Sequence, residues 1–287
     1  MARLRIVATA RAAAWAVVVA AVLAGCAPSG LDSELSRAPA TTTTAPVDPA
    51  IRDLMDGAGM TPAAQKVFVA ASPALEDKAT LAQSCASLDT SASGTAHTYG
   101  CVVRGKIHVR LFSAPELHDM IYVVAAHELL HVVYGQLTTG ERVRLDDQLQ
   151  DARTDNAVLA ERLRVYAASD DDTPNEVHSV LGTEFAGLSP DLEAHFSRYI
   201  DRTMVLGAFA RTLGDREAEL RRLQASVDEM KDRLDTMSAE MEVLRAAGDL
   251  RTFNARVPAF NALVRQYNAA VDQLKTKVAE HKALVST

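Results

Sequence analysis

One stretch of the sequence, His127-Glu128-Leu129-Leu130-His131, contains side chains that can bind a metal ion and move a proton. The two histidines are four residues apart, so on a helix both imidazoles project from one face toward a single point. Two such nitrogens are suitable ligands for a tetrahedral Zn²⁺. Glu128 would lie beside the metal, where its carboxylate can take a proton from a water whose pKa the zinc has lowered. The alternative is a buried helix with two satisfied histidines and an incidental glutamate.

The residues around this stretch predict the helix that such a geometry needs. Residues 123–126 before it and 132–133 after it are uncharged. Upstream, the Ser-Ala-Pro-Glu sequence at 113–116 offers a capping residue, a proline for the first turn and a glutamate at the capping-box position. We therefore expect a helix from this box through Tyr134.

Two histidines leave a zinc ion one protein ligand short, and a later segment resembles one that supplies the third ligand in a known enzyme family. Residues 175–179, Asn-Glu-Val-His-Ser, resemble the Asn-Glu-x-x-Ser segment of thermolysin-like enzymes, with a Gly-Thr pair close behind. With the His-Glu-x-x-His stretch, they make roughly residues 97–187 similar to a zincin metallopeptidase of the gluzincin branch, closer to the small gluzincins than to thermolysin. The resemblance implies Zn²⁺ as cofactor, Glu176 as the third ligand beside His127 and His131, and Glu128 as the general base.

The third ligand has alternatives. Glu176 stands three residues after Thr173, so its carboxylate could instead close a capping box at the start of its helix. Glu184 and His178, expected on the same helix, are the reserve ligands.

The chain also departs from the related families. Tyr134 and Leu137 stand where a metzincin would need a glycine and a third histidine, which excludes that branch. Val180 stands where thermolysin-like enzymes have an aspartate that supports a zinc-bound histidine, so another hydrogen-bond acceptor is required. Three residues are equal candidates for stabilising the oxyanion: His178, Tyr134 and Tyr166.

Two segments before the zinc stretch, 97–103 and 106–112, alternate loosely around an Arg-Gly pair and predict a β-hairpin. In zincins an edge strand above the active-site helix pairs with the extended backbone of the substrate. We expect residues 106–112 to be that strand, which carries Lys106, His108 and Arg110. The alternative is a two-stranded lid with no role in substrate binding.

The first 26 residues predict export and lipid attachment. Three arginines precede an apolar run at 12–24, which is too short to span a bilayer comfortably. The run ends in Leu-Ala-Gly-Cys26, which resembles the bacterial lipobox and implies that residues 1–25 are a signal peptide and Cys26 is lipidated. Residues 26–50 would then form a flexible Thr- and Pro-rich tether on the extracytoplasmic face of the cell membrane. The alternative is an uncleaved anchor helix in which Cys26 is incidental.

Export also bears on the other two cysteines, Cys85 and Cys101. In an oxidising compartment, two remaining cysteines most simply pair with each other. We expect a disulfide, with two buried free thiols as the alternative.

Apolar spacing and capping residues predict the remaining helices. They are expected at 51–57, 61–71 and 74–84, from a capping box at Thr138 and Glu141 to about Ala167, from Thr173, and from Ser189.

The C-terminal third has a different pattern. Apolar residues recur at alternating steps of three and four in two series, 206–244 and 253–278, with a break at Arg216 and a Gly-containing turn between the series. This pattern predicts an antiparallel coiled-coil hairpin over 206–287. Pro258 should delay or kink the second helix near its start.

These patterns combine into one architecture. We expect a mainly α fold with a small β-hairpin (α+β), in which a gluzincin-like helical domain at 51–205 precedes the coiled-coil hairpin. Aromatic residues make up 5% of the chain, which suits a helical core, and the formal charge of −7 argues against nucleic-acid binding.

The function most consistent with these observations is that of a membrane-anchored, extracytoplasmic zinc metallopeptidase acting on a peptide or protein. The alternative is a lipid-tethered coiled-coil protein that docks on an envelope protein through the hairpin, with a structural or vestigial zinc site. A lesser alternative is zinc-dependent hydrolysis of a non-peptide amide in the cell wall.

Overall fold

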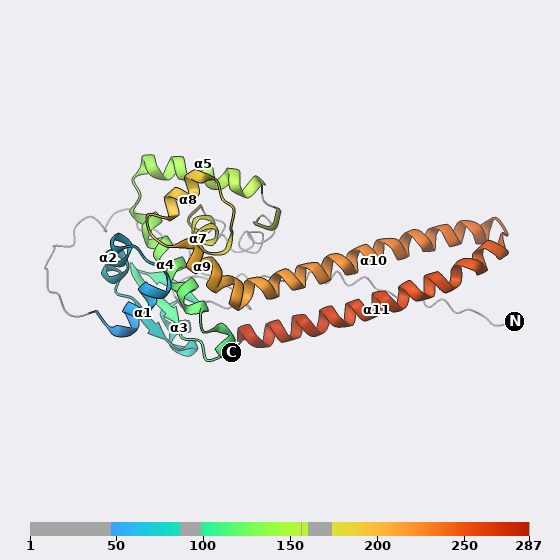
Figure 1. Cartoon of the computed structure of the whole chain (residues 1–287), viewed down its shortest axis with the longest axis horizontal. Helices are drawn as coiled ribbons and strands as arrows, with labels where there is room; N and C mark the ends of the chain where they lie inside the picture. The colour runs from blue at the N-terminus through green and yellow to red at the C-terminus, as the bar shows by residue number, and fades with distance from the viewer. Residues whose placement is uncertain (1–46, 87–98, 156, 160–173, 287) are drawn as a thin grey trace. The chain divides into compact units, whose positions relative to one another are not determined.

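The computed structural model describes residues 47–86, 99–155, 157–159 and 174–286, and it confirms a mainly helical fold with a small sheet (Figure 1). Two compact units divide the chain. One unit contains Leu220–Val278; the other contains the described residues up to Glu219 together with those from Ala279 onward. Within the described residues, no helix is both long and apolar enough to cross a bilayer. Cys26 and the expected signal peptide lie outside them.

The first two helices begin where their caps predict. α1 (Pro49–Gly57) is capped by Asp48, whose side chain accepts from the backbone N–H of Ala50, and α2 (Pro62–Ala70) is capped in the same way by Thr61. Each helix has a proline in its first turn, where no N–H partner is needed. Both helices were expected from the sequence.

A three-stranded sheet has the order β1-β3-β2, formed by β1 (Ala74–Glu76), β2 (Gly100–Val103) and β3 (Lys106–Arg110). β2 and β3 are antiparallel, which confirms the hairpin, and β1 runs parallel to β3. The turn residues Arg104 and Gly105 have φ of 51° and 74°, the left-handed conformation that a two-residue hairpin turn requires.

The helix expected over 74–84 is wrong in its first part. Residues 74–76 form β1, and α3 (Lys78–Ser84) begins after Asp77, whose side chain accepts from the backbone N–H of Thr80. Apolar spacing over so few residues does not distinguish strand from helix. The outcome depends on β3, which offers β1 a strand to pair with.

The expected role of residues 106–112 as a substrate-pairing edge strand is also wrong. β3 lies between β1 and β2, so both of its edges are occupied. Lys106 is exposed, whereas the side chains of His108 and Arg110 are buried. Nδ1 of His108 lies 2.8 Å from Oε1 of Glu76, and the Arg110 guanidinium carbon lies 5.2 Å from the centre of the Tyr99 ring and 5.3 Å from that of the Phe112 ring.

The expected disulfide is present. Cys85, just after α3, is bonded to Cys101 of β2, with the two Cα atoms 6.1 Å apart. The bond therefore ties α3 to the sheet.

The central helix is α4 (Met120–Gln136), which packs against β2, β3, α1, α2 and two later helices. Twelve of its residues are buried, which explains why it has no polar face. The capping box expected at 113–116 does not form: a short 3₁₀ turn, Pro115–Leu117, stands there without a side-chain cap, and the α-helix begins at Met120.

Among the described residues after α4 are helices α5, α7 and α8. α5 (Thr139–Asp155) opens with the expected capping box, in which the Glu141 carboxylate accepts from the Thr138 N–H at 2.9 Å and the Thr138 hydroxyl accepts from the Glu141 N–H. α7 (Pro174–Glu184) packs against α4, and α8 (Pro190–Phe196) is capped by Ser189. Thr173 and the expected end of the α5 helix near Ala167 lie outside the described residues.

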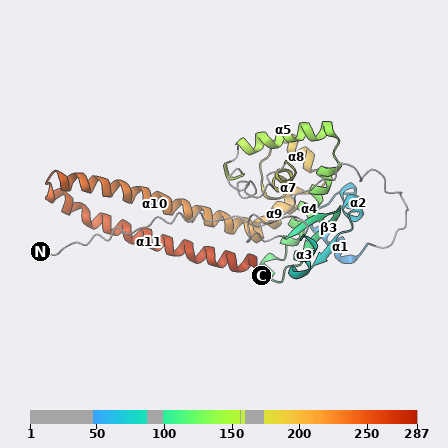
Figure 2. The ribbon, with the colours of Figure 1, turned by 180° about the vertical axis from the view of Figure 1, so that it is seen from behind.

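The expected helical hairpin is present. α10 (Asp215–Ala246) and α11 (Leu250–Ser286) are joined by a turn in which Gly248 has φ 76°, and both views show the two helices side by side (Figures 1 and 2). The seam of the unit that contains Leu220–Val278 is apolar. Its buried residues include Leu220, Val227 and Leu274, with Tyr267 and Val271 among those packed against them.

The ends of the expected hairpin belong to the other unit, which contains the described residues up to Glu219 and those from Ala279 onward. Phe209 of α9 (Arg202–Phe209), Leu213 and Val285 pack in the main core. Between α9 and α10 the helix has a π-helical segment, Ala210–Gly214, immediately before the place where the heptad pattern breaks. α11 begins at Leu250 and continues through Pro258, so the expected delay of this helix is wrong.

Candidate metal centre

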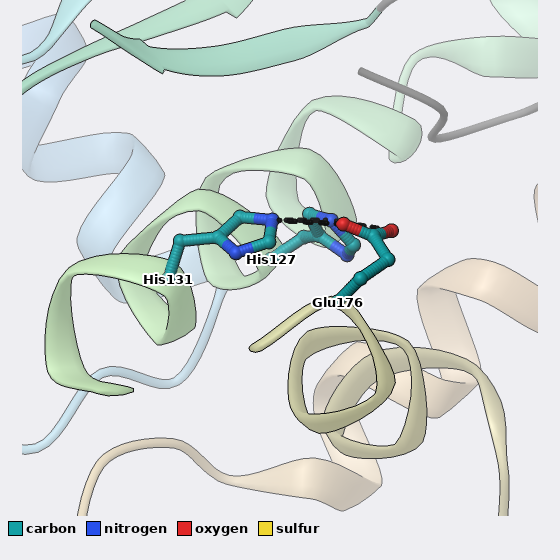
Figure 3. A group of neighbouring side chains, drawn as sticks. All are labelled: His127, His131 and Glu176. Atoms are coloured by element: carbon teal, nitrogen blue, oxygen red, sulfur yellow. Dashed lines mark hydrogen bonds and ion pairs between the residues drawn. The ribbon is translucent and has the colours of Figure 1, made fainter. Parts of the chain in front are cut away.

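Three buried side chains from two helices meet at one point (Figure 3). Nε2 of His127 lies 3.1 Å from Nε2 of His131. The Glu176 carboxylate closes the group, with one oxygen 3.6 Å from Nε2 of His127 and the other 3.3 Å from Nε2 of His131. The three residues are exposed by 1%, 5% and 0%, respectively.

This spacing fits a tetrahedral metal ion. Ligands at about 2.0–2.1 Å from a tetrahedral centre lie about 3.3–3.4 Å from one another. The 3.1 Å between the two imidazole nitrogens is close to that value, and each nitrogen has one Glu176 oxygen near it, at 3.6 Å for His127 and 3.3 Å for His131. Two imidazoles and a carboxylate are also the donor set of catalytic zinc sites that keep a fourth position open. The group could therefore hold a metal ion.

Two features of the helices bring the ligands together. His127 and His131 are one helical turn apart on α4, and Glu176 is in the first turn of α7. α7 approaches α4 closely because residue 182 is glycine: a Cβ there would lie 2.4 Å from Cδ1 of Leu130, well inside van der Waals contact. Gly182 thus permits the spacing between the two helices that carry the ligands.

Asn175 supplies the hydrogen-bond acceptor that the sequence left unnamed. Its Oδ1 lies 3.1 Å from Nδ1 of His131, and its side chain is buried. When Nδ1–H donates to this oxygen, the lone pair of Nε2 is directed at the metal position. Asn175 directly precedes Glu176, so the Asn-Glu pair was the sequence signal for both roles.

The charges around His131 favour a cation. Burial alone would lower its pKa, but the Glu176 carboxylate, with smaller contributions from Glu128 and Asn175, raises the pKa overall. Negative charge is thus concentrated where the two imidazole nitrogens converge.

Glu128 lies against the backbone of β2. It is 1% exposed, and a Cβ on Gly100 would lie 2.6 Å from its Oε1 and 2.8 Å from its Cγ. Only glycine at position 100 leaves room for this carboxylate. Sequence reasoning missed Gly100, although a glycine inside a predicted strand often marks such a close approach.

The reserve ligands do not join the group. His178 is buried, and its Nε2 lies 2.8 Å from Nε2 of His195 on α8. Burial, followed by the charges of His195 and His131, holds the pKa of His178 well below its usual value. Glu184 is at the far end of α7 and is only half-buried. The Glu176 carboxylate instead points at the two histidines (Figure 3).

The oxyanion candidates have other partners where the structure describes them. The Tyr134 hydroxyl donates to Oδ1 of Asp146 at 2.6 Å, and burial together with this bond raises the pKa of Tyr134. His178 is paired with His195, and Tyr166 lies outside the described residues.

No family model, curated protein or solved structure matches this chain.

Proposed function

We propose that this protein is a zinc-dependent metallopeptidase of the gluzincin type. The observation that carries the proposal is the buried group of His127, His131 and Glu176, whose spacing suits a tetrahedral ion, with Glu128 next to it on the same helix. A structural zinc site more often has four protein ligands, whereas a set of three leaves a position for substrate or water.

The residues of the chain divide the chemistry among them. Zn²⁺ bound here would supply a Lewis acid that polarises the scissile carbonyl. Glu128 takes the proton from the attacking water and later gives it to the leaving amine. Asn175 keeps His131 in the tautomer that presents Nε2. Because Glu128 is buried against Gly100, its carboxylate has little freedom to leave this position.

In this proposal β2 replaces β3 as the strand that pairs with the substrate. Within the described residues β2 is at the edge of the sheet and is hydrogen-bonded only to β3. Its Gly100 is the residue that touches Glu128. An extended peptide added to this edge would pass close to the general base.

We further propose that the enzyme acts outside the cytoplasm, tethered to the membrane through Cys26. The Cys85–Cys101 disulfide supports an oxidising compartment. Replacement C26S should move the protein from the membrane fraction to soluble or unprocessed forms. A C26S protein that is still processed and membrane-bound would contradict the lipid anchor.

A second candidate function rests on the helical hairpin. Val243 and Leu250, on either side of its turn, are 68% and 59% exposed, and such residues could contact an envelope protein. In that case the metal centre would be structural, and Glu128 would have no catalytic role.

The two candidates are separated by metal content and peptide hydrolysis, measured together on the mature chain. H131A should lose both zinc and hydrolysis, while E128Q should keep zinc and lose nearly all hydrolysis. E184Q is the matched control and should keep both. Full hydrolysis in E128Q, or no zinc in the wild type, would contradict the proposal. Bound zinc without hydrolysis of any quenched fluorescent peptide would favour the hairpin function.

A further inference from the structure

We propose that Tyr99 is a positioning residue for Glu128, acting through the backbone of Gly100, and that the last turn of α11 holds Tyr99 in place. The inference rests on the proposed function, because it assigns Glu128 the role of general base. It adds that a residue away from the metal centre fixes the position of Glu128 without contacting the metal ligands.

Tyr99 and the first two residues of β2 each contact a different helical segment. The Tyr99 hydroxyl donates to the backbone carbonyl of Val285 in α11 at 3.2 Å. Gly100 lies against Glu128 of α4. Cys101 is bonded to Cys85, immediately after α3. The glycine that touches the base is therefore held on both sides.

Tyr99 is itself firmly packed. Its side chain is fully buried, and its ring meets the Phe112 ring edge-on at 5.0 Å between centroids. The Arg110 guanidinium carbon lies 5.2 Å from the centre of the Tyr99 ring. The backbone N–H of Arg110 donates to the backbone carbonyl of Tyr99 at 2.8 Å. In such an environment the hydroxyl has one well-defined direction, toward Val285.

β2 needs this support because it is an edge strand. Its ladder to β3 holds one side only, and the attachments at Tyr99 and Cys101 add to this ladder in opposing a shift of β2 relative to α4. A shift would open the contact between Gly100 and Glu128. Misplacement of a catalytic group by about 1 Å can cost up to about a hundredfold in rate. The metal ligands, on α4 and α7, take no part in this contact.

The hydrogen bond from Tyr99 to Val285 links β2 to the last turn of α11. Residues from Ala279 onward belong to the same unit as Tyr99 and Glu128, and Leu284 and Val285 pack with its main core. The rest of α11 forms one arm of the helical hairpin. A force or a partner that displaces the last turn of α11 would thus reach Glu128 through Tyr99.

The test compares two substitutions that each remove one hydroxyl from the zinc-loaded mature chain. Y99F removes the bond to Val285 and keeps the ring. Y122F is the matched control, because the Tyr122 hydroxyl donates to Asp53 of α1 at 3.1 Å. Three quantities are measured: zinc affinity by chelator competition, amide hydrogen exchange of residues 100–103, and kcat on a quenched fluorescent peptide.

We expect Y99F to exchange its β2 amides about tenfold faster and to lose about tenfold or more in kcat, with zinc affinity unchanged. Y122F should match the wild type in all three measurements. The double variant C85S/C101S should act on β2 exchange in the same direction as Y99F.

Wild-type exchange at β2 in Y99F would overturn the inference, as would a loss of zinc affinity parallel to the loss of kcat. If the wild type hydrolyses no peptide, the proposed function fails, while the exchange measurement still decides whether Tyr99 holds β2.

Discussion

Oδ1 of Asn175 lies 3.1 Å from Nδ1 of His131, so the residue that precedes Glu176 in the candidate metal centre also orients one of its two histidines. Asn175 and Glu176 both lie in the first turn of α7, which packs against α4. The centre is thus assembled by one helix pair, and changes to this pair should be visible in metal affinity.

The first prediction concerns this hydrogen bond. N175A removes the acceptor from His131 and should weaken zinc binding about 10- to 100-fold, because an unsupported imidazole is a weaker and less well-oriented ligand. N175D keeps an acceptor oxygen and should bind zinc at least as tightly as the wild type. Chelator competition measures both. Equal affinity in N175A and the wild type would show that the bond does not support the metal.

The second prediction concerns the disulfide. A soluble form that lacks Cys26 should have no titratable thiol under denaturing, non-reducing conditions, because Cys85 and Cys101 are bonded to each other. The two cysteines are 16 residues apart in sequence, and a loop of this length predicts a loss of about 3 kcal/mol in the free energy of unfolding on reduction. Urea unfolding with and without reductant measures the loss. Two free thiols in the unreduced protein would refute the pairing.

The third prediction concerns acid stability. Burial, followed by the charge of Arg198, lowers the pKa of His195 to about 4 from its ordinary value of 6.5. Between these two values the unfolded chain binds a proton at this residue that the folded protein does not bind. The contribution of His195 is therefore complete above pH 6.5 and is lost as the pH falls toward 4.

The measurement is the free energy of unfolding of the zinc-loaded wild type and of H195Q across this range. H195Q should lose less stability than the wild type between pH 6.5 and pH 4. Titration of the metal ligands contributes equally to both proteins and cancels in the comparison. Parallel curves would mean that His195 does not titrate in this way.

The elements that could be predicted from the sequence are those determined by neighbours within one or two turns. The capping box of Thr138 and Glu141, the cap at Ser189 and the hairpin around the Arg104-Gly105 pair all form as expected. The pair of His127 and His131 belongs to the same class, because four residues on a helix determine a shared face. The position of Glu176 came from its resemblance to a known segment.

The features that could not be predicted depend on which distant segments meet. Residues 74–76 are a strand because β3 lies beside them, and β3 is central because β1 covers its second edge. Asn175 and Gly100 acquire their roles only through residues on another helix or strand. The Asn-Glu pair and the glycine within a strand mark these positions in the sequence, but neither pattern identifies the residue that each one meets.

The last prediction concerns the spacing of the two helices that carry the ligands. A Cβ on Gly182 would lie 2.4 Å from Leu130 and 2.9 Å from Phe196, and both of those side chains are fully buried. G182A should therefore push α7 away from α4 and reduce the free energy of unfolding by about 1–3 kcal/mol.

Because Glu176 moves with α7 while His127 and His131 stay on α4, G182A should also weaken zinc binding. The matched control is G135A, on the exposed side of α4, where an added Cβ meets nothing within 4 Å. This control should keep wild-type zinc affinity and gain about 0.5–1 kcal/mol in stability, since alanine favours a helix over glycine. Zinc affinity and urea unfolding are measured on both variants. A destabilised G182A that binds zinc as tightly as the wild type would show that the metal centre tolerates a change in the spacing of α4 and α7.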